Sequence, residues 1–144
     1  MKKIAVSSCL LGENVRYDGN NMRNDKLIKL LHNCEVVSIC PEILGGLSTP
    51  RLSSEIIDGK VYNSKHIDIT NNFIVGANAT LNKIKDCEFV ILKTKSPSCG
   101  YKKIYDGSFT GKLIDGNGIF AQLCISNNIK VFTEEDLDNI IDLL

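Results

Sequence analysis

The sequence predicts an α/β fold: a single three-layer domain over residues 1–144 in which a mostly parallel, Rossmann-like sheet lies between helices and small hairpins flank it. Three observations lead to this prediction. Short β-branched runs alternate along the chain with segments whose apolar residues recur at helical spacing. The connections between these segments are short, which favours right-handed crossovers between parallel strands. The length of 144 residues is that of one domain with one core.

The first half of the chain predicts two strands of the central sheet. Residues 3–7 and 35–39 are short apolar runs, and the second is mostly β-branched, which is typical of a strand covered on both faces. Between them, residues 24–32 carry leucine and isoleucine at helical spacing, which predicts a helix. The Gly- and Pro-containing residues 45–50 predict a loop, and an Asp-Gly pair within residues 55–62 predicts a hairpin.

The second half predicts the other two strands. Residues 70–85 have an apolar stripe at helical spacing, and residues 89–92 form a third apolar strand. Two Asp-Gly pairs bracket the segment 106–116, which predicts a second small hairpin. The last expected elements are a helix over residues 119–126, a strand over residues 130–132 and a helix over residues 134–144 with Thr133 as its N-cap.

The charge balance argues against several classes of protein. Seventeen basic and seventeen acidic residues cancel, so the chain has no overall field to hold a nucleic-acid backbone or an anionic membrane. No segment has the pattern of a signal peptide, and no apolar run is long enough to cross a bilayer. We therefore expect a cytoplasmic protein, whose six cysteines indicate free thiols and metal ligation in preference to disulfides.

Three of the six cysteines lie where an expected strand ends: Cys9, Cys40 and Cys99. The carboxyl ends of parallel strands meet at one crevice, which is the usual position of a ligand in an open α/β sheet. Three thiolates at one crevice are typical of a site for a soft metal or an iron–sulfur cluster, and a set of three protein ligands leaves a coordination position open. The other cysteines are expected in the core, because free cysteine is among the most buried residue types: Cys34, Cys87 and Cys124.

Residues next to these cysteines are candidates for catalysis and substrate binding. Glu42 lies two residues beyond Cys40, where burial would raise its pKa and suit it to proton transfer; a solvated loop carboxylate is the alternative. Ser96 and Ser98 lie in a loop whose hydroxyl and N–H groups could bind an anion or the polar edge of a ligand. Plain turn formation is the alternative for both serines.

Three further charged residues are candidates for lining the same pocket and binding substrate. Arg16 and Asp18 follow Cys9 on one loop, where an Asp-Gly pair also suits a turn. Arg51 is expected either to pair with Glu55 or to reach a ligand.

Three separated motifs carry a resemblance to a known family. The first is Cys9-Leu10-Leu11-Gly12 with Arg16-Tyr17-Asp18-Gly19, the second is Cys40-Pro41-Glu42 with Gly45-Gly46-Leu47 and Pro50-Arg51, and the third is Leu92-Lys93 with Ser96-Pro97-Ser98-Cys99-Gly100. In this order, and over essentially the whole chain, the sequence resembles the thiouracil desulfurase family. No appended second domain is present, which favours a free base or nucleoside over a large RNA as the substrate.

The resemblance implies a non-redox iron–sulfur desulfurase. It implies an oxygen-sensitive [4Fe-4S] cluster held by Cys9, Cys40 and Cys99 with one iron open, and catalytic help from Glu42 and Ser96. The implied reaction converts the thiocarbonyl of a small thiolated pyrimidine base or nucleoside, such as 2-thiouracil, to a carbonyl at that open iron. A thiocarbonyl sulfur is a soft donor, which suits an iron bound by thiolates.

Two other classes of protein fit the same cysteines. A zinc-dependent hydrolase would use three thiolates and an activated water, although three anionic sulfurs make bound zinc a poor acid. A non-enzymatic redox or iron sensor would use the cluster to report oxidation, although such a protein has no use for the acid/base group Glu42 beside the metal. On the residues alone, both alternatives stay open.

Overall fold

A parallel four-stranded sheet forms the centre of the computed structural model, which describes residues 1–144. Its strands, in spatial order, are β2 (Glu35–Ile39), β1 (Lys3–Ser7), β5 (Phe89–Leu92) and β8 (Val131–Thr133). Each neighbouring pair is parallel. The α/β prediction is confirmed, with three strands at the expected residues and β8 displaced by one residue from the expected 130–132.

The strand order determines where the connections cross the sheet. With the core strands counted in chain order, the sheet runs 2-1-3-4, as in the flavodoxin-like order, whereas a Rossmann sheet begins 3-2-1-4. The Rossmann-like part of the prediction is therefore not confirmed. In the observed order the chain reverses its direction across the sheet between β1 and β5, so the switch-point crevice lies at the carboxyl ends of these strands.

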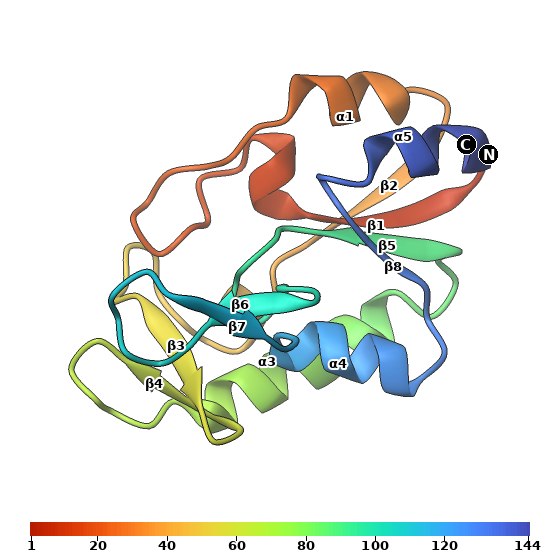
Figure 1. Ribbon diagram of the computed structural model, residues 1–144. Helices are drawn as coiled ribbons and strands as arrows, with labels where there is room; N and C mark the ends of the chain where they lie inside the picture. The colour runs from red at the N-terminus through yellow and green to blue at the C-terminus, as the bar shows by residue number, and fades with distance from the viewer.

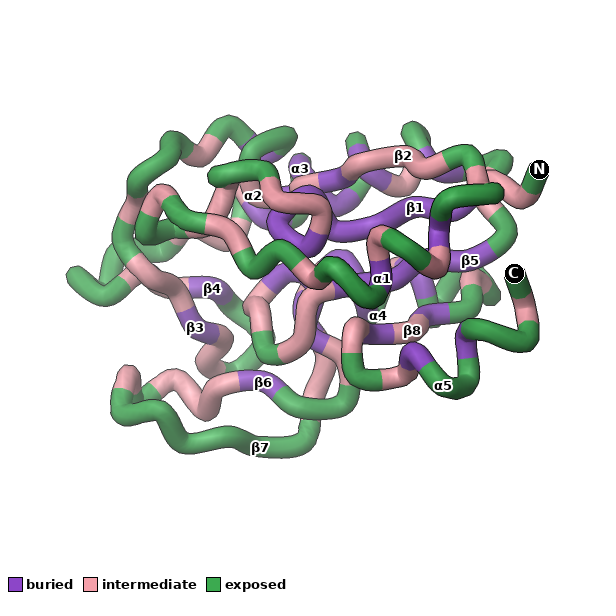
Figure 2. Tube along the Cα trace, turned by 90° about the horizontal axis from the view of Figure 1, so that it is seen from above, coloured by how far each residue is buried: buried purple, intermediate pink, exposed green.

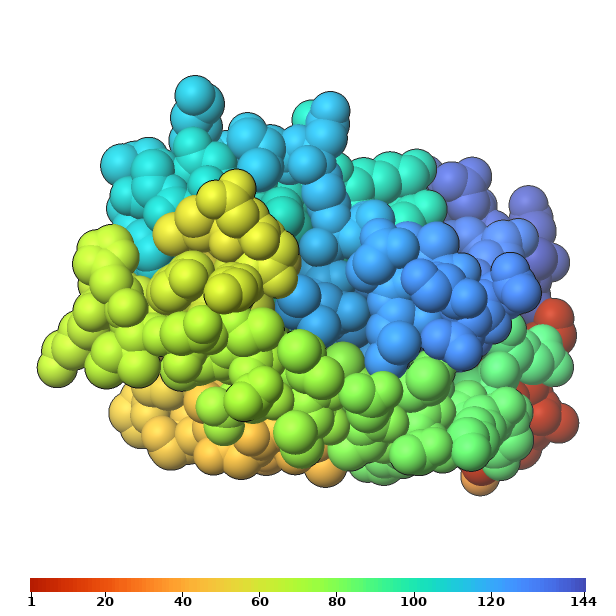
Figure 3. Space-filling view, turned by 90° about the horizontal axis from the view of Figure 1, so that it is seen from below, coloured from red at the N-terminus to blue at the C-terminus, as the bar shows by residue number.

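Helices cover both faces of the sheet, as Figure 1 shows. One face carries α1 (Asp25–Leu30) and α5 (Leu137–Ile140), and the other carries α3 (Thr70–Lys83) and α4 (Ile119–Ser126), which lie side by side (Figure 3). Alternate residues of β1 point to opposite faces, so Ile4 packs with α1 and α5 while Ala5 packs with α3 and α4. Figure 2 shows that β1 and β5 are buried along most of their length. No helix is both long and apolar enough to span a membrane.

The end of the chain differs from the prediction. A helix forms within the expected residues 134–144, but its predicted start and its predicted N-cap, Thr133, are wrong. α5 begins at Leu137 with Asp136 as N-cap and is followed by a 3-10 turn, Ile141–Leu143. The Asp136 carboxylate accepts hydrogen bonds from the N–H and the hydroxyl of Thr133 at 2.9 and 3.2 Å, which closes a tight turn before the helix. Glu134 therefore stands at the carboxyl end of β8 instead of in a helix.

Two hairpins extend from one end of the sheet. β3 (Ser54–Ile57) and β4 (Lys60–Asn63) form the first, with the predicted Asp-Gly turn at positive φ. β6 (Lys103–Tyr105) and β7 (Leu113–Asp115) form the second hairpin. Its first strand therefore lies before residues 106–116, the segment that was expected to form the whole hairpin. The Glu55 carboxylate on β3 accepts the N–H groups of Gly107 and Phe109 at 3.0 and 3.2 Å, which ties the two hairpins together.

A short helix, α2 (Pro41–Leu44), follows β2 where the sequence indicated no regular element. Pro41 occupies its first turn, where a missing N–H and a fixed φ suit a helix start. α2 packs on α3 through backbone contacts at two glycines: a Cβ on Gly76 would lie 1.9 Å from the Pro41 carbonyl oxygen, and one on Gly45 would lie 2.1 Å from a carbonyl oxygen of α3. These contacts place α2, and with it Glu42, against the end of the sheet.

Candidate active site

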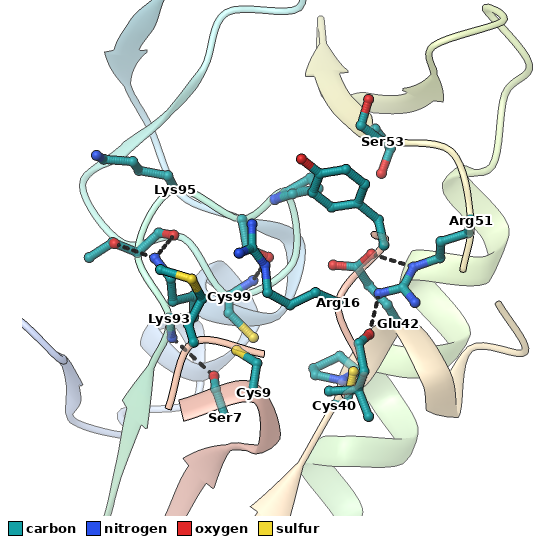
Figure 4. A pocket seen from close by; sticks show the side chains of 18 of the residues that line it. Ser7, Cys9, Arg16, Cys40, Glu42, Arg51, Ser53, Lys93, Lys95 and Cys99 are labelled. Carbon is teal, nitrogen blue, oxygen red and sulfur yellow. Dashed lines mark hydrogen bonds and ion pairs between the residues drawn. The ribbon is translucent and has the colours of Figure 1, made fainter. Parts of the chain in front are cut away.

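A cavity of about 660 Å³ opens at the carboxyl ends of β1, β2 and β5. The segments that follow these strands form one wall, and the two hairpins contribute Glu55, Tyr105 and Phe109 to the other. Figure 4 shows its side chains from close by. The cavity brings together most of the residues that the sequence singled out: Cys9, Cys40, Cys99, Glu42, Ser96, Arg16 and Arg51.

The three cysteines reach the cavity from three different strand ends. Cys9 lies in a 3-10 turn (Ser8–Leu11) directly after β1, Cys40 is the N-cap of α2 after β2, and Cys99 lies in the loop after β5. All three are free thiols, and their side chains lie on the same side of the cavity in Figure 4. The strand order therefore brings residues that are far apart in the sequence into one space.

Burial dominates the ionisation of these thiols. It raises the pKa of Cys9 to about 11, and the nearby Lys93 ammonium acts in the opposite direction. It raises the pKa of Cys99 well above the ordinary 9.0, partly offset by a hydrogen bond with the Ser7 hydroxyl. Burial also raises the pKa of the Cys40 thiol. A metal centre deprotonates a coordinating thiol, so metal binding in this cavity must overcome the cost of burying thiolates.

The other cysteines lie outside the cavity. Cys124 is buried in the core on α4, while Cys34 and Cys87 are partly buried just before β2 and β5. No three His, Cys, Asp or Glu side chains of the chain form a group that could hold a single metal ion. The three cavity cysteines therefore share one space, and the other three thiols lie apart from it.

Glu42 is held beside the thiols by Arg51. Nε of Arg51 lies 3.2 Å from Oε1 of Glu42, and the two side chains are only 9% and 15% exposed. Burial raises the pKa of Glu42, while Arg51 and the Ser96 hydroxyl act in the opposite direction. Arg51 also donates to two backbone carbonyl oxygens at 2.9 and 3.1 Å, which fixes its guanidinium. Arg51 thus pairs with Glu42 and not with Glu55, which accepts the N–H groups of the β6–β7 turn.

The loop after β5 separates the two candidate serines. Ser96 lines the cavity, and its Oγ accepts the N–H groups of Ser98 and Cys99 at 3.1 and 3.0 Å, which leaves its own proton available to Glu42. Ser98 does not line the cavity; its side chain is buried elsewhere in the loop, and its Oγ has no hydrogen-bond partner. Asp18 does not line it either, because its carboxylate is exposed and accepts the N–H two residues further along a turn.

Two charged residues of this region were missed at the level of sequence. Lys93 follows β5 directly and lines the cavity, and its Nζ lies 3.0 Å from Oε2 of Glu134, which follows β8. Like the three cysteines, Lys93 follows a predicted strand of the sheet. This position could have identified it as a residue of the cavity from the sequence alone. Glu134 had no such signal, because its segment resembles the first turn of a helix.

Known proteins share this fold and sequence. The sequence profile of the 2-thiouracil desulfurase family matches residues 4–136. The uncharacterized protein YbbK of Bacillus subtilis (strain 168) is 40% identical over 150 residues, which cover 96% of this chain and 99% of YbbK. The solved structure of a [4Fe-4S]-dependent thiouracil desulfidase, TudS, superposes with a TM-score of 0.91 at 36% identity, over 100% of both chains.

Proposed function

This chain belongs to the 2-thiouracil desulfurase family, and on that premise we propose that it removes sulfur from a thiolated pyrimidine base or nucleoside in the cavity at the sheet edge. The observation that carries the proposal is the meeting of three free thiols with Glu42 and Ser96 in one cavity. In the overall reaction a thiocarbonyl and water give a carbonyl and hydrogen sulfide, so no electrons are exchanged.

Cys9, Cys40 and Cys99 would hold a [4Fe-4S] cluster, the group named for the similar TudS structure. The donor set fits this group, because three soft thiols, none of them in a disulfide, line one cavity. Three thiolates would make bound zinc a poor acid, which favours a cluster over the zinc of a hydrolase. When bound, the cluster supplies a soft open iron that polarises a thiocarbonyl.

Glu42 is the proposed acid/base. Its carboxylate takes a proton from the water that adds to the thiocarbonyl carbon and returns a proton to the departing sulfur. Burial raises the pKa of Glu42, which makes it a better base than an exposed carboxylate. Arg51 binds one of its oxygens at 3.2 Å and the Ser96 hydroxyl also hydrogen-bonds the carboxylate, so the carboxylate keeps one orientation.

Arg16 is the proposed substrate contact. Its side chain extends into the cavity in Figure 4, and none of the ion pairs of the chain includes it. An unpaired guanidinium is free to donate hydrogen bonds to a carbonyl or ring nitrogen of a pyrimidine. Arg51 is proposed to act on the substrate through Glu42, because hydrogen bonds to Glu42 and to three other acceptors hold its guanidinium in place.

Anaerobic reconstitution with iron and sulfide tests the cofactor. The wild type is expected to take up a cluster, measured as iron and sulfide per chain and as visible absorption, and Cys9→Ala, Cys40→Ala and Cys99→Ala are not. Cys34→Ala is the matched control, because this thiol lies outside the cavity and should not affect loading. Loading that depends on Cys34 and not on Cys99 would contradict the assignment.

Anaerobic turnover of 2-thiouracil, followed as loss of its thiocarbonyl absorbance, tests catalysis. Glu42→Gln keeps the size of the side chain but cannot exchange the proton, so it should load the cluster and lose about 10²–10⁴-fold in rate. Ser96→Ala should lose less, because water partly replaces a positioning hydrogen bond. Glu88→Gln changes an exposed carboxylate and serves as the control. Full activity in loaded Glu42→Gln would remove Glu42 from the mechanism, and a loaded but inactive wild type would favour the redox sensor.

A further inference from the structure

Lys93 and Glu134 form an ion pair that is largely shielded from water and that the proposed reaction does not use. The register of the sheet brings them together, because Leu92, the last residue of β5, pairs with Thr133, the last residue of β8, and each charged residue directly follows its strand. Nζ of Lys93 lies 3.0 Å from Oε2 of Glu134, and the two side chains are 17% and 14% exposed. The two charges are therefore in direct contact and largely shielded from water.

Thr94 holds both charges in one geometry. The Lys93 ammonium donates to the hydroxyl and the carbonyl oxygen of Thr94 at 3.0 and 3.3 Å, in addition to Glu134. The Glu134 carboxylate accepts the N–H and the hydroxyl of Thr94 at 2.9 and 3.1 Å. All three donors of the ammonium are thus occupied, so Lys93 cannot turn away without leaving a shielded charge unpaired.

The ion pair is oriented with its positive end toward the thiols. Lys93 lines the cavity together with Cys9, whereas Glu134 does not line it. Figure 4 shows Lys93 on the same side of the cavity as Cys9 and Cys99. The cavity therefore receives a net positive influence from a pair that is neutral as a whole.

Stability alone does not account for this arrangement. The desolvation of two buried charges offsets most of their attraction, so a buried ion pair is weak evidence of a stabilising role. At the wall of a cavity that collects thiolates, an oriented positive charge has a second effect. Net charge near an iron–sulfur cluster is one of the factors that set the electron density on its irons and its reduction potential.

We propose that Lys93, held in place by Glu134 and Thr94, supplies the positive charge that balances the three thiolates of the cavity and keeps the cluster site electron-poor. This inference rests on the proposed function. A bound cluster made electron-poor in this way would be a stronger Lewis acid toward the thiocarbonyl sulfur. The positive charge of Lys93 would also stabilise the negative charge that develops on the sulfur as the carbon–sulfur bond breaks. Lys93 acts through electrostatics and exchanges no proton or bond with the substrate.

The midpoint reduction potential of the reconstituted cluster tests the sign of this effect. Lys93→Met removes the positive charge and should shift the potential to a lower value. Glu134→Gln keeps the shape of the acceptor but removes the negative charge behind Lys93, so it should shift the potential to a higher value. Opposite shifts from the two partners of one ion pair do not follow from a general loss of structure.

Lys103→Met is the matched control, because it breaks an exposed ion pair with Asp115 outside the cavity and should leave the potential unchanged. If Lys93→Met does not fold, the Glu134→Gln variant decides alone, and an unchanged or lower potential in it overturns the inference. A wild type that takes up no cluster overturns the proposed function as well. If the wild type takes up a cluster and both variants have the same midpoint potential as the wild type, only the role of Lys93 is overturned.

Discussion

Replacing Gly76 with alanine tests whether the contact between α2 and α3 positions the proposed acid/base. At this residue of α3, a Cβ would lie 1.9 Å from the carbonyl oxygen of Pro41 in α2. An ordinary carbon–oxygen contact is about 3.3 Å, so the two backbones must separate by about 1.4 Å, the difference between these distances. Glu42 is the next residue of α2, so it is displaced together with this helix.

The expected losses of stability and rate follow from this displacement. Alanine is favoured over glycine inside a helix by about 1 kcal/mol, whereas overpacking a rigid contact costs up to about 3 kcal/mol. The free energy of unfolding should therefore fall by about 2 kcal/mol, which in a protein of 144 residues lowers the melting temperature by roughly 4–8 °C. A catalytic group misplaced by about 1 Å loses about 10²-fold in rate.

Thermal unfolding followed by circular dichroism, and anaerobic turnover of 2-thiouracil per loaded cluster, measure the two effects. Val75→Ala is the matched control, because Val75 precedes Gly76 on α3 but is 59% exposed, so its loss should change stability by less than about 0.5 kcal/mol. A Gly76→Ala protein as stable and active as the wild type would refute the argument. A protein that is less stable but equally active would show that the contact does not position Glu42.

Three further outcomes are expected elsewhere in the chain. Glu55→Ala leaves two N–H groups of the β6–β7 turn without their acceptor, so it should cost about 1–3 kcal/mol and make this turn easier to cleave in limited proteolysis; unchanged protease resistance would contradict this. Cys124→Ala leaves a small void in the core and should cost about 1 kcal/mol in urea unfolding with the iron content unchanged, and a bleached protein would identify Cys124 as a ligand. Hydrogen bonds from Thr70 lower the pKa of Asp68 below its ordinary 3.8. Their stabilisation is present above that value and lost as the pH falls below it, so Asp68→Asn should reduce the acid sensitivity of unfolding below about pH 4, and an unchanged acid profile would argue against it.

The strand ends that carry the cysteines were predictable from local sequence. A run such as Glu35–Ile39 is short, apolar and rich in β-branched residues, so its preference for a strand does not depend on distant parts of the chain. The residue after such a run lies at a strand end whatever the strand order. Because the ends of parallel strands meet at one edge, the grouping of Cys9, Cys40 and Cys99 could be inferred before the order of the strands was known.

Close backbone packing was not predictable in this way. Glycine has a low helix propensity, so Gly76 is unfavourable in α3 by local sequence. The Pro41 carbonyl oxygen nevertheless approaches so closely that no side chain fits at this residue. The same holds for the loop after β5, where two serines of equal chemistry have different surroundings: Ser96 lines the cavity and Ser98 is buried outside it. The space available at Gly76 and the surroundings of each serine depend on which part of another element packs against that residue.

The partners of the charged residues were likewise decided only by the tertiary structure. In the sequence Arg51 lies closer to Glu55 than to Glu42, yet it binds Glu42, because the hairpin turns Glu55 toward the β6–β7 turn. Glu134 has the sequence environment of a helix start, yet the register of β8 against β5 places it on Lys93. Local sequence determines where a strand ends and which chemical groups follow it. The neighbour that each group meets depends on strand order and register, which the packing of the whole sheet sets.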